Sequence, residues 1–142
     1  MIVVDANVLL YAVNADSRQH EPARAWLDAA LIGNRPLGFS WVVLLAFLRL
    51  ATSRSVFPRP LTTGEAGDVL ETWLTAPAAL VLSPTARHLA VLRGLLDEAG
   101  TAGNLVTDAH LAALAAEHGG TVASFDRDFG RFTGVRTLVP GA

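Results

Sequence analysis

The chain contains no cysteine and no lysine, and each absence excludes a class of chemistry. Without cysteine there are no disulfides, no thiolate nucleophile and no cysteine-ligated zinc or iron–sulfur site. Any bound metal ion must therefore be held by oxygen or imidazole ligands. All eleven basic residues are arginine. Guanidinium groups suit bidentate phosphate contacts, although a compositional bias of the coding genome is the simpler explanation.

Long hydrophobic runs and strong charge are also missing. No apolar run reaches the roughly 20 residues that a membrane-spanning helix needs, and the N-terminus has neither a basic leader nor a small-residue cleavage site. We therefore expect a cytoplasmic protein with no membrane contact. The formal net charge of -2 differs from the basic profile of a general nucleic-acid binder. Any RNA contact is expected to be local.

The residues that are present favour one domain with parallel strands. A length of 142 residues with 51% hydrophobic residues can bury a core of normal size. Short apolar runs alternate with helical patterns, which implies right-handed crossovers and a sheet covered on both faces. We predict a three-layer α/β/α domain over residues 1–142 with a central parallel sheet of four or five strands. Strands are predicted at 2–5, 37–40, 79–82, 121–125 and 135–139, and helices at 7–14, 21–32, 41–51, 62–75, 83–99 and 103–120.

Two of the predicted helices have recognisable ends. Thr62 followed by Glu65 forms a capping box, in which each residue binds the other's backbone amide. Ser83 and Pro84 are expected to begin the next helix, and Gly100 to end it.

The helix predicted at residues 41–51 is apolar on every side except at Arg49. This pattern predicts a largely buried helix. A buried Arg49 could bind phosphate or pair with an acid of a functional site, and a structural ion pair is the main alternative.

Four aspartates occupy positions that could bring them together. Asp5 ends the first predicted strand, and Asp126 and Asp128 follow the fourth. Asp108 lies near the start of the helix that leads into the fourth strand. Ligands of open parallel sheets bind at the carboxyl ends of the strands, near the point where the strand order reverses. We therefore expect the four carboxylates to converge at this edge.

Three of these aspartates have a structural alternative. Asp5 could equally well cap the helix that follows it, because aspartate is a preferred N-cap residue. Asp126 could cap the short helical turn after the fourth strand. Asp128 could simply provide a favourable charge in the first turn of that helix.

Asp108 is harder to explain structurally. Its helix already has Asn104 or Thr107 available as a cap. A rotation of about 100° per residue places Asp108 on the same side as the apolar residues Leu105 and Leu111. A carboxylate on that stripe needs a partner.

A cation would explain the cluster. Several carboxylates close together repel one another and take up protons unless a cation lies between them. Oxygen ligands without thiolates suit Mg²⁺ or Mn²⁺. Such an ion can orient a phosphodiester, neutralise the charge that develops on its oxygens and activate a water for in-line attack. This chemistry is that of a nuclease.

Three stretches in this order and spacing resemble the PIN domain of VapC toxins, the ribonuclease components of bacterial toxin–antitoxin pairs, and especially the mycobacterial-type branch. They are MIVVDANVLLYAVNADS, WVVLLAFLRLAT and GNLVTDAHLAALAAEHGGTVASFDRDFGRF. The resemblance covers nearly the whole chain. It implies a five-stranded parallel sheet, Mg²⁺ or Mn²⁺ as cofactor, an RNA substrate, a homodimer, and a VapB antitoxin that occupies the active-site groove.

The resemblance also assigns roles to individual acids. Asp5 matches the first metal-binding acid of the family, Asp108 the third, Asp126 the next acidic or polar position, and Asp128 the acid of the closing motif. We thus predict all four as catalytic, with the first three as metal ligands. Many PIN domains have a glutamate where this chain has Ala46. Some members of the mycobacterial-type branch lack it too, so the change puts a second metal ion in doubt rather than catalysis itself.

Other polar residues are candidates for supporting roles. Asn7 could donate to a carboxylate or to metal-bound water, or begin a helix. Thr107 could orient an acid or cap its helix. His110 lies about 200° around the helix from Asp108, so it is not expected at the same metal. The remaining histidines show no ligand spacing. The arginines expected either to contact RNA or to be solvated charges are Arg18, Arg54, Arg127 and Arg131.

Two other functions were weighed against the nuclease. An aspartyl-phosphate enzyme or receiver domain also has an acid after its first strand, but those folds rely on a late lysine, and this chain has none. A PIN domain that binds RNA or its antitoxin without cutting is suggested by Ala46. Nothing in the arginine positions distinguishes a tRNA loop from a ribosomal stem-loop as target.

Overall fold

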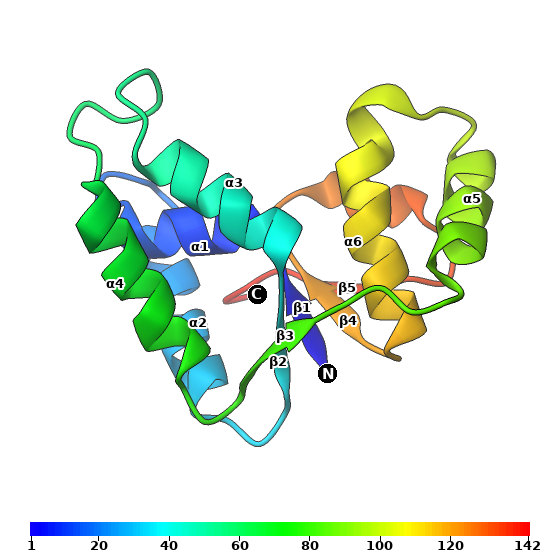
Figure 1. Cartoon of the computed structure of the whole chain (residues 1–142), viewed down its shortest axis with the longest axis horizontal. Coiled ribbons are helices and arrows are strands. Elements are labelled where there is room, and N and C mark those ends of the chain that lie inside the picture. The colour runs from blue at the N-terminus through cyan, green and yellow to red at the C-terminus, as the bar shows by residue number, and fades with distance from the viewer.

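The computed structural model describes all residues 1–142 and shows a five-stranded parallel sheet in the order β3-β2-β1-β4-β5, with helices on both faces (Figure 1). The predicted fold class is confirmed, with five strands. The strands are β1 (Ile2–Val4), β2 (Leu37–Ser40), β3 (Ala79–Leu82), β4 (Thr121–Ala123) and β5 (Arg136–Leu138). The helices are α1 (Ala6–Val13), α2 (His20–Leu31), α3 (Trp41–Ala51), α4 (Thr63–Leu74), α5 (His88–Ala99) and α6 (Val106–Glu117), with short 3₁₀ helices η1 (Gly103–Leu105) and η2 (Arg127–Arg131).

The strand order reverses between β1 and β4. The chain moves outward from β1 to β2 and β3, and then returns past β1 to form β4 and β5. Right-handed crossovers in opposite directions place α1–α4 on one face and α5 and α6 on the other, as Figure 1 shows. A crevice at the carboxyl ends of β1 and β4 follows from this reversal.

The central strands are apolar because both of their faces are covered. Val3, Val4 and Val122 are fully buried, and β1 pairs with β4 through Val4 opposite Ala123. The fourth strand was predicted to reach residue 125 but ends at Ala123. Its last two predicted residues instead turn out of the sheet, where they take part in the hydrogen bonds of the crevice.

The capping box at the start of α4 is confirmed. Glu65 accepts from the Thr62 amide at 2.9 Å, and Thr62 Oγ1 accepts from the Glu65 amide at 3.1 Å. The predicted start of α5 at residues 83–84 is wrong, because the helix begins at His88. The amide and hydroxyl of Thr85 are bound by a carboxylate of α6, which holds the preceding segment out of the helix.

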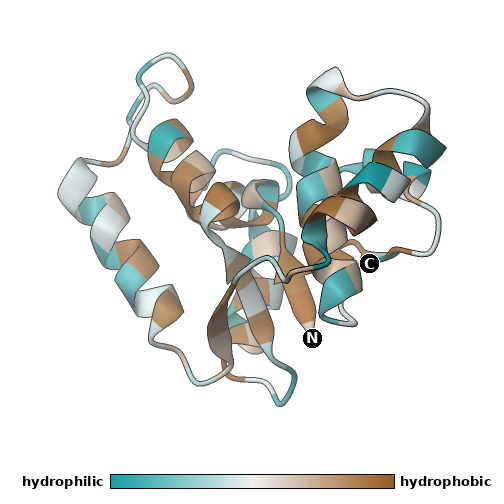
Figure 2. Ribbon diagram, turned by 45° about the vertical axis from the view of Figure 1, so that its right-hand side comes forward, coloured by the Kyte–Doolittle hydropathy of each residue, from teal (hydrophilic) through white to brown (hydrophobic).

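The prediction that α3 is largely buried is wrong. Val43, Leu44 and Phe47 form a buried face, but Trp41 and Leu45 are 54% and 58% exposed. Apolar residues cover most of this helix (Figure 2), yet no second helix covers its outer side. None of the helices combines the length and apolarity that a membrane crossing would require.

Candidate active site

The reversal of strand order brings the end of β1 next to the end of β4. The Asp5 amide donates to the Ala123 carbonyl at 3.0 Å, so the residues that leave the two strands start side by side. Asp5 comes from the first strand, and Ser124 and Asp126 come from the fourth. Two segments that are more than a hundred residues apart in the chain therefore build one edge of the crevice.

Asp5 caps α1, as the structural alternative predicted, and its second carboxylate oxygen faces β4. Its Oδ1 caps α1 by accepting from the Ala6 amide at 2.7 Å. Its Oδ2 points across to β4 and accepts from Ser124 Oγ at 2.6 Å. The pKa of Asp5 is raised because burial outweighs these two hydrogen bonds, and the charge of Asp126 raises it further. A cation beside Asp5 would offset this cost.

Ser124 is a site residue that the sequence analysis missed. Its side chain is 3% exposed. It donates to Asp5 and accepts from the Asp126 amide at 2.9 Å, so it joins the two acids. Asn7 supports it: Asn7 Nδ2 donates to Ser124 Oγ at 3.2 Å, and Asn7 Oδ1 accepts from the Phe125 amide at 3.2 Å. The small polar residue at the end of an apolar strand was the available sequence signal.

Asp108 lies in the first turn of α6 and is half-buried. The expectation that Asn104 or Thr107 caps this helix is wrong, because the N-cap residue is Leu105 and no side chain caps the helix. Both polar residues are exposed. The apolar residues predicted to share the side of Asp108 are buried, as expected.

The charge environment of Asp108 shows that the four acids act on one another. Its pKa is raised to about 6, first by burial and then by the charges of Asp5, Asp126 and Asp128. No cationic side chain is among the causes. We call these four residues the acid cluster. It concentrates negative charge at one place in the crevice.

The two acids after β4 also have local roles. Asp126 caps η2, because its Oδ1 accepts from the Asp128 amide at 2.8 Å. The capping alternative is thus correct for Asp126, and Asp128 lies in the first turn of η2 as expected. Asp128 is more than half exposed and lies 4.0 Å from Arg131 Nε.

The chemistry of the acid cluster fits a hard divalent cation. Its potential ligands are carboxylate oxygens, and neither a thiol nor an imidazole lies among them. In the present side-chain positions no three acids or histidines converge tightly enough to hold a metal ion. The oxygens of Asp5 and Asp126 are engaged in hydrogen bonds instead. Metal binding would thus require these carboxylates to leave their present positions.

The remaining candidates lie at the surface. Arg49 is exposed and takes part in no ion pair, so the alternative of a buried ion pair is wrong. Arg127 is exposed at the start of η2. Both remain candidates for RNA contacts, and Thr107 remains a candidate to orient Asp108.

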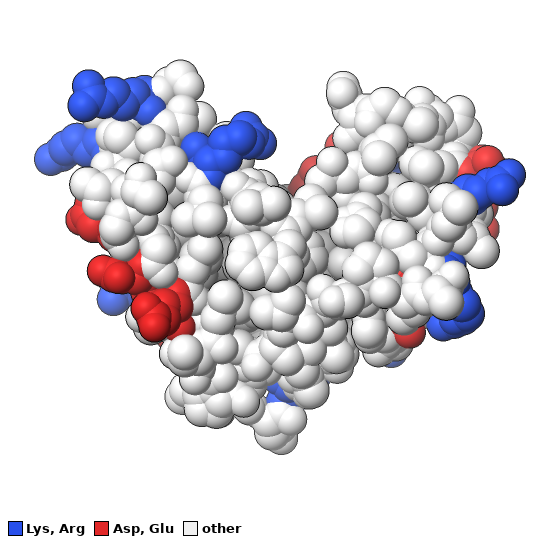
Figure 3. Space-filling view, in the orientation of Figure 1, with Lys and Arg blue, Asp and Glu red and all other residues white.

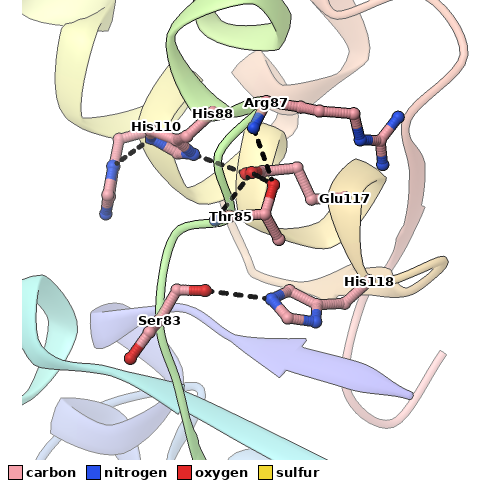
Figure 4. Close-up of polar contacts among 7 residues, drawn as sticks. All are labelled: Ser83, Thr85, Arg87, His88, His110, Glu117 and His118. Atoms are coloured by element: carbon pink, nitrogen blue, oxygen red, sulfur yellow. Dashed lines mark hydrogen bonds and ion pairs between the residues drawn. The ribbon is translucent and has the colours of Figure 1, made fainter.

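Three histidines contact other residues near α5 and α6, which the sequence did not predict (Figure 4). His88 Nδ1 is hydrogen-bonded to Glu117, and His88 Nε2 lies 2.9 Å from His110 Nδ1. Glu117 also accepts from the amide and hydroxyl of Thr85, and its side chain is fully buried. His118 Nε2 is hydrogen-bonded to the Ser83 carbonyl at 3.1 Å. His110 thus faces α5 rather than the acid cluster, as expected.

The sequence and the fold both match known proteins. The family model described as "PIN domain" matches residues 2–135. Ribonuclease VapC37 of Mycobacterium tuberculosis is 54% identical over 142 residues, which is 100% of this chain and 99% of that protein. The chain belongs to the PIN-domain VapC ribonuclease family.

Solved PIN-domain structures have the same fold at low sequence identity. The crystal structure of Mycobacterium tuberculosis VapC20, described as a sarcin–ricin loop cleaving toxin, matches with a TM-score of 0.68 at 20% identity over 96% of this chain and 99% of that chain. The structure of VapBC2 from Rickettsia felis, bound to a DNA fragment from its promoter, matches with a TM-score of 0.67 at 17% identity over 98% of each chain. The predicted resemblance to VapC toxins is confirmed.

The PIN-domain glutamate position is Ala46, which lies on α3 and is partly buried. No residue of α3 is acidic, so this helix adds no carboxylate to the acid cluster. Every acid that acts on Asp108 lies directly after β1 or in the segment after β4.

Replacing Ser124 by alanine tests how this PIN domain orients Asp5. The hydrogen bond from Ser124 lowers the pKa of Asp5. Its loss should move the acidic limb of the pH–rate profile to higher pH and lower the rate by about tenfold, the lower end for a residue that orients a metal ligand. Ser124→Thr, which keeps the hydroxyl, should retain the wild-type limb. An unchanged limb in Ser124→Ala would contradict a role for this hydroxyl.

Proposed function

We propose that the chain, acting as one PIN domain over residues 1–142, is the toxin of a toxin–antitoxin pair and an Mg²⁺- or Mn²⁺-dependent endoribonuclease. The observation that carries the proposal is the raised pKa of Asp108, which results from burial and the charges of three other aspartates. A half-buried carboxylate that is surrounded by like charges, with no cationic side chain acting on it, is costly unless it binds a cation. The 54% sequence identity to Ribonuclease VapC37 supports ribonuclease activity.

In this proposal Asp5, Asp108 and Asp126 hold the metal ion. Ser124 and Asn7 fix the position of Asp5 through the hydrogen bonds between β1 and β4. A divalent ion supplies charge neutralisation for the phosphodiester and lowers the pKa of an attacking water. The pKa of Asp108 is raised to about 6, so its carboxylate is suited to accept a proton from that water. Asp128 lies at the exposed side of the cluster and adds negative charge.

A structured RNA such as a tRNA is the proposed substrate, and a VapB-type antitoxin and a second copy of the chain are the proposed partners. The description of VapC20 as a sarcin–ricin loop cleaving toxin supports a structured RNA. The occurrence of VapB together with VapC in the Rickettsia felis structure supports the antitoxin. The second candidate function is binding of RNA or antitoxin without cleavage, which the missing glutamate at Ala46 favours.

Mapping RNA 5′ ends in cells that express the chain tests the proposal. A discrete set of new ends with 5′-phosphates is expected, because in-line attack by water with the 3′-oxygen as leaving group gives a 5′-phosphate on one product and a 3′-hydroxyl on the other. The Asp5→Asn variant should produce none of these ends. Products with 2′,3′-cyclic phosphates would contradict hydrolysis by a metal-activated water, and RNA binding without new ends would favour the second candidate.

Removal of the metal ion provides a further prediction. Treatment of the purified protein with EDTA should abolish cleavage of the mapped RNA, and Mg²⁺ or Mn²⁺ in excess should restore it. The measurement is the initial rate of cleavage of a labelled RNA before and after re-addition. Ca²⁺ serves as the control, because it binds oxygen ligands in larger and less regular shells. A rate that EDTA leaves unchanged would contradict metal dependence.

A further inference from the structure

The loop between α3 and α4, residues 52–62, is rich in arginine and proline and contains no acid. It belongs to a longer segment, residues 29–64, which has four arginines and no aspartate or glutamate. The rest of the chain carries all thirteen acids, so this segment is a basic region in an acidic protein. Such a region fits a polyanion better than it fits a general protein surface.

The loop is held in one shape by its own backbone. The Leu61 amide donates to the Ala51 carbonyl at 2.9 Å and closes the loop at its base. Inside the loop, the Phe57 amide donates to the Ser53 carbonyl at 3.0 Å. Loops with closed ends and internal packing keep their side chains in fixed places and are frequently functional. The two loop arginines, Arg54 and Arg59, are therefore positioned by an ordered backbone.

These two arginines line an open recess of about 740 Å³ together with the hydroxyl-bearing residues Thr52, Thr62 and Thr63. Leu61 is the sole hydrophobic residue in its lining apart from prolines. A recess made of guanidinium and hydroxyl groups suits phosphate oxygens and is unsuited to an apolar side chain.

Neither arginine has a partner within the protein. Arg54 and Arg59 take part in no ion pair and no side-chain hydrogen bond. The nearest acid along the chain, Glu65, is held by Thr62 in the capping box. Their donors are thus available to a ligand.

The place of the loop on the molecule fits a substrate that also reaches the acid cluster. Figure 3 shows the molecule hollowed between the part that carries α3 and the part that carries α6. Arginine side chains gather over the outer end of α3 and the α3–α4 loop, one group near the hollow and the others on the outer side of the molecule, and acidic atoms are visible inside the hollow. A chain of phosphates can therefore contact the rim while one of its bonds lies in the hollow.

We infer that Arg54 and Arg59 form a binding site for backbone phosphates of RNA, separate from the acid cluster. The inference rests on the proposed ribonuclease function and adds a residue-level account of how an acidic protein holds an RNA. Two guanidinium groups offset locally the repulsion that the net charge of -2 and the acid cluster exert on phosphates.

Binding of a labelled single-stranded RNA of fixed sequence tests the inference. All proteins carry Asp108→Asn so that the RNA stays intact, and Kd is measured by fluorescence anisotropy over a range of salt concentrations. The Arg54→Ala/Arg59→Ala variant should bind about tenfold more weakly. The slope of log Kd against log salt concentration should fall by about 1.4, because each lost contact with a single strand removes about 0.7.

Arg87→Ala/Arg93→Ala is the matched control. It removes the same charge from two exposed positions: Arg87 is the N-cap residue of α5, and Arg93 lies within this helix. This control should keep the wild-type slope. Arg54→Lys/Arg59→Lys should also keep the slope, because lysine retains the charge, and should lose only part of the affinity. If Arg54→Ala/Arg59→Ala behaves like the α5 control, the inference is overturned.

Cleavage by proteins with an intact acid cluster separates this inference from the proposed function. The Arg54→Ala/Arg59→Ala variant should raise KM about tenfold and leave kcat unchanged, since the lost contacts hold the RNA equally before and during the reaction. If this variant cleaves RNA normally and loses only the binding of an acidic peptide, the RNA site is overturned and the proposed nuclease is not. If the wild type binds RNA but does not cleave it, and the arginine substitutions weaken this binding, the RNA site is supported and the proposed nuclease is overturned.

Discussion

Replacing Asp108 by asparagine should lower the rate of RNA cleavage by about 1,000-fold, a loss of roughly 4 kcal/mol of transition-state stabilisation. The substitution keeps the shape of the side chain but removes the charge that attracts a cation and the oxygen that can accept a proton. Because asparagine fits the same space, the fold should be preserved. The measurement is kcat/KM on the mapped RNA at saturating Mg²⁺.

The same substitution should increase the stability of the metal-free protein at neutral pH. A carboxyl group whose pKa rises to about 6 on folding destabilises the folded state increasingly as the pH rises from the ordinary aspartate range towards 6. The charged form is the disfavoured one, so the penalty is complete above about pH 6. For a fully buried group this penalty would lower the free energy of unfolding by roughly 3 kcal/mol. Water around the half-exposed Asp108 reduces the penalty to about 1 kcal/mol.

Thermal unfolding without metal therefore provides a test that does not depend on activity. Above about pH 6, Asp108→Asn should melt at a higher temperature than the wild type, and below about pH 4 the two should melt together. Addition of Mg²⁺ should stabilise the wild type much more than the variant. Asp97→Asn, at an exposed position of α5, is the matched control and should show neither effect. Equal melting of wild type and Asp108→Asn at every pH, with or without Mg²⁺, would contradict the acid cluster.

Replacing Glu117 by alanine should have the largest effect on stability among the substitutions considered, about 2 kcal/mol. The side chain of Glu117 is fully buried and holds Thr85 and His88, which join the start of α5 to the end of α6. Its removal leaves a buried amide, a hydroxyl and an imidazole without their acceptor. The measurement is the free energy of unfolding from urea titrations at neutral pH.

The pH dependence of this contribution has a defined direction. Burial raises the pKa of Glu117, but the hydrogen bonds from Thr85 and His88 outweigh it, and the net pKa is lowered. The contribution is thus present above the ordinary pKa of glutamate and is lost as the pH falls through the lower pKa of the folded state. Glu98→Ala, at an exposed position of α5, is the control and should change the free energy of unfolding by less than about 0.5 kcal/mol. A similarly small loss for Glu117→Ala would contradict the structural role of the cluster.

The sequence predicted the fold well because parallel strands covered on both faces leave a strong signal. Residues 2–4 are a continuous apolar run of this kind and form the buried strand β1, whereas the run at 79–82 forms the edge strand β3, in which Leu80 and Val81 are exposed. The starts of helices were less predictable. The first turn of α5 depends on Glu117, which lies about thirty residues further along the chain, so no local pattern could reveal it.

The candidate site was predicted in part. Strand ends indicated Asp5, Asp126 and Asp128, and an acid on an apolar stripe indicated Asp108. The raised pKa of Asp108 supports their proximity, while their role as metal ligands stays a prediction. The role of Ser124 was missed because its meaning lies in a hydrogen bond to a residue 119 positions away. The histidine contacts were missed for a similar reason: they depend on how α5 packs against α6.

The position of β1 between β2 and β4 has a consequence for the time at which the protein can act. Asp5 is synthesised more than a hundred residues before Asp108, Ser124 and Asp126. A chain that has been synthesised only as far as β4 thus lacks Asp126 and Asp128, which follow that strand. A nascent polypeptide of this protein therefore cannot assemble the acid cluster until the segment after β4 has been made.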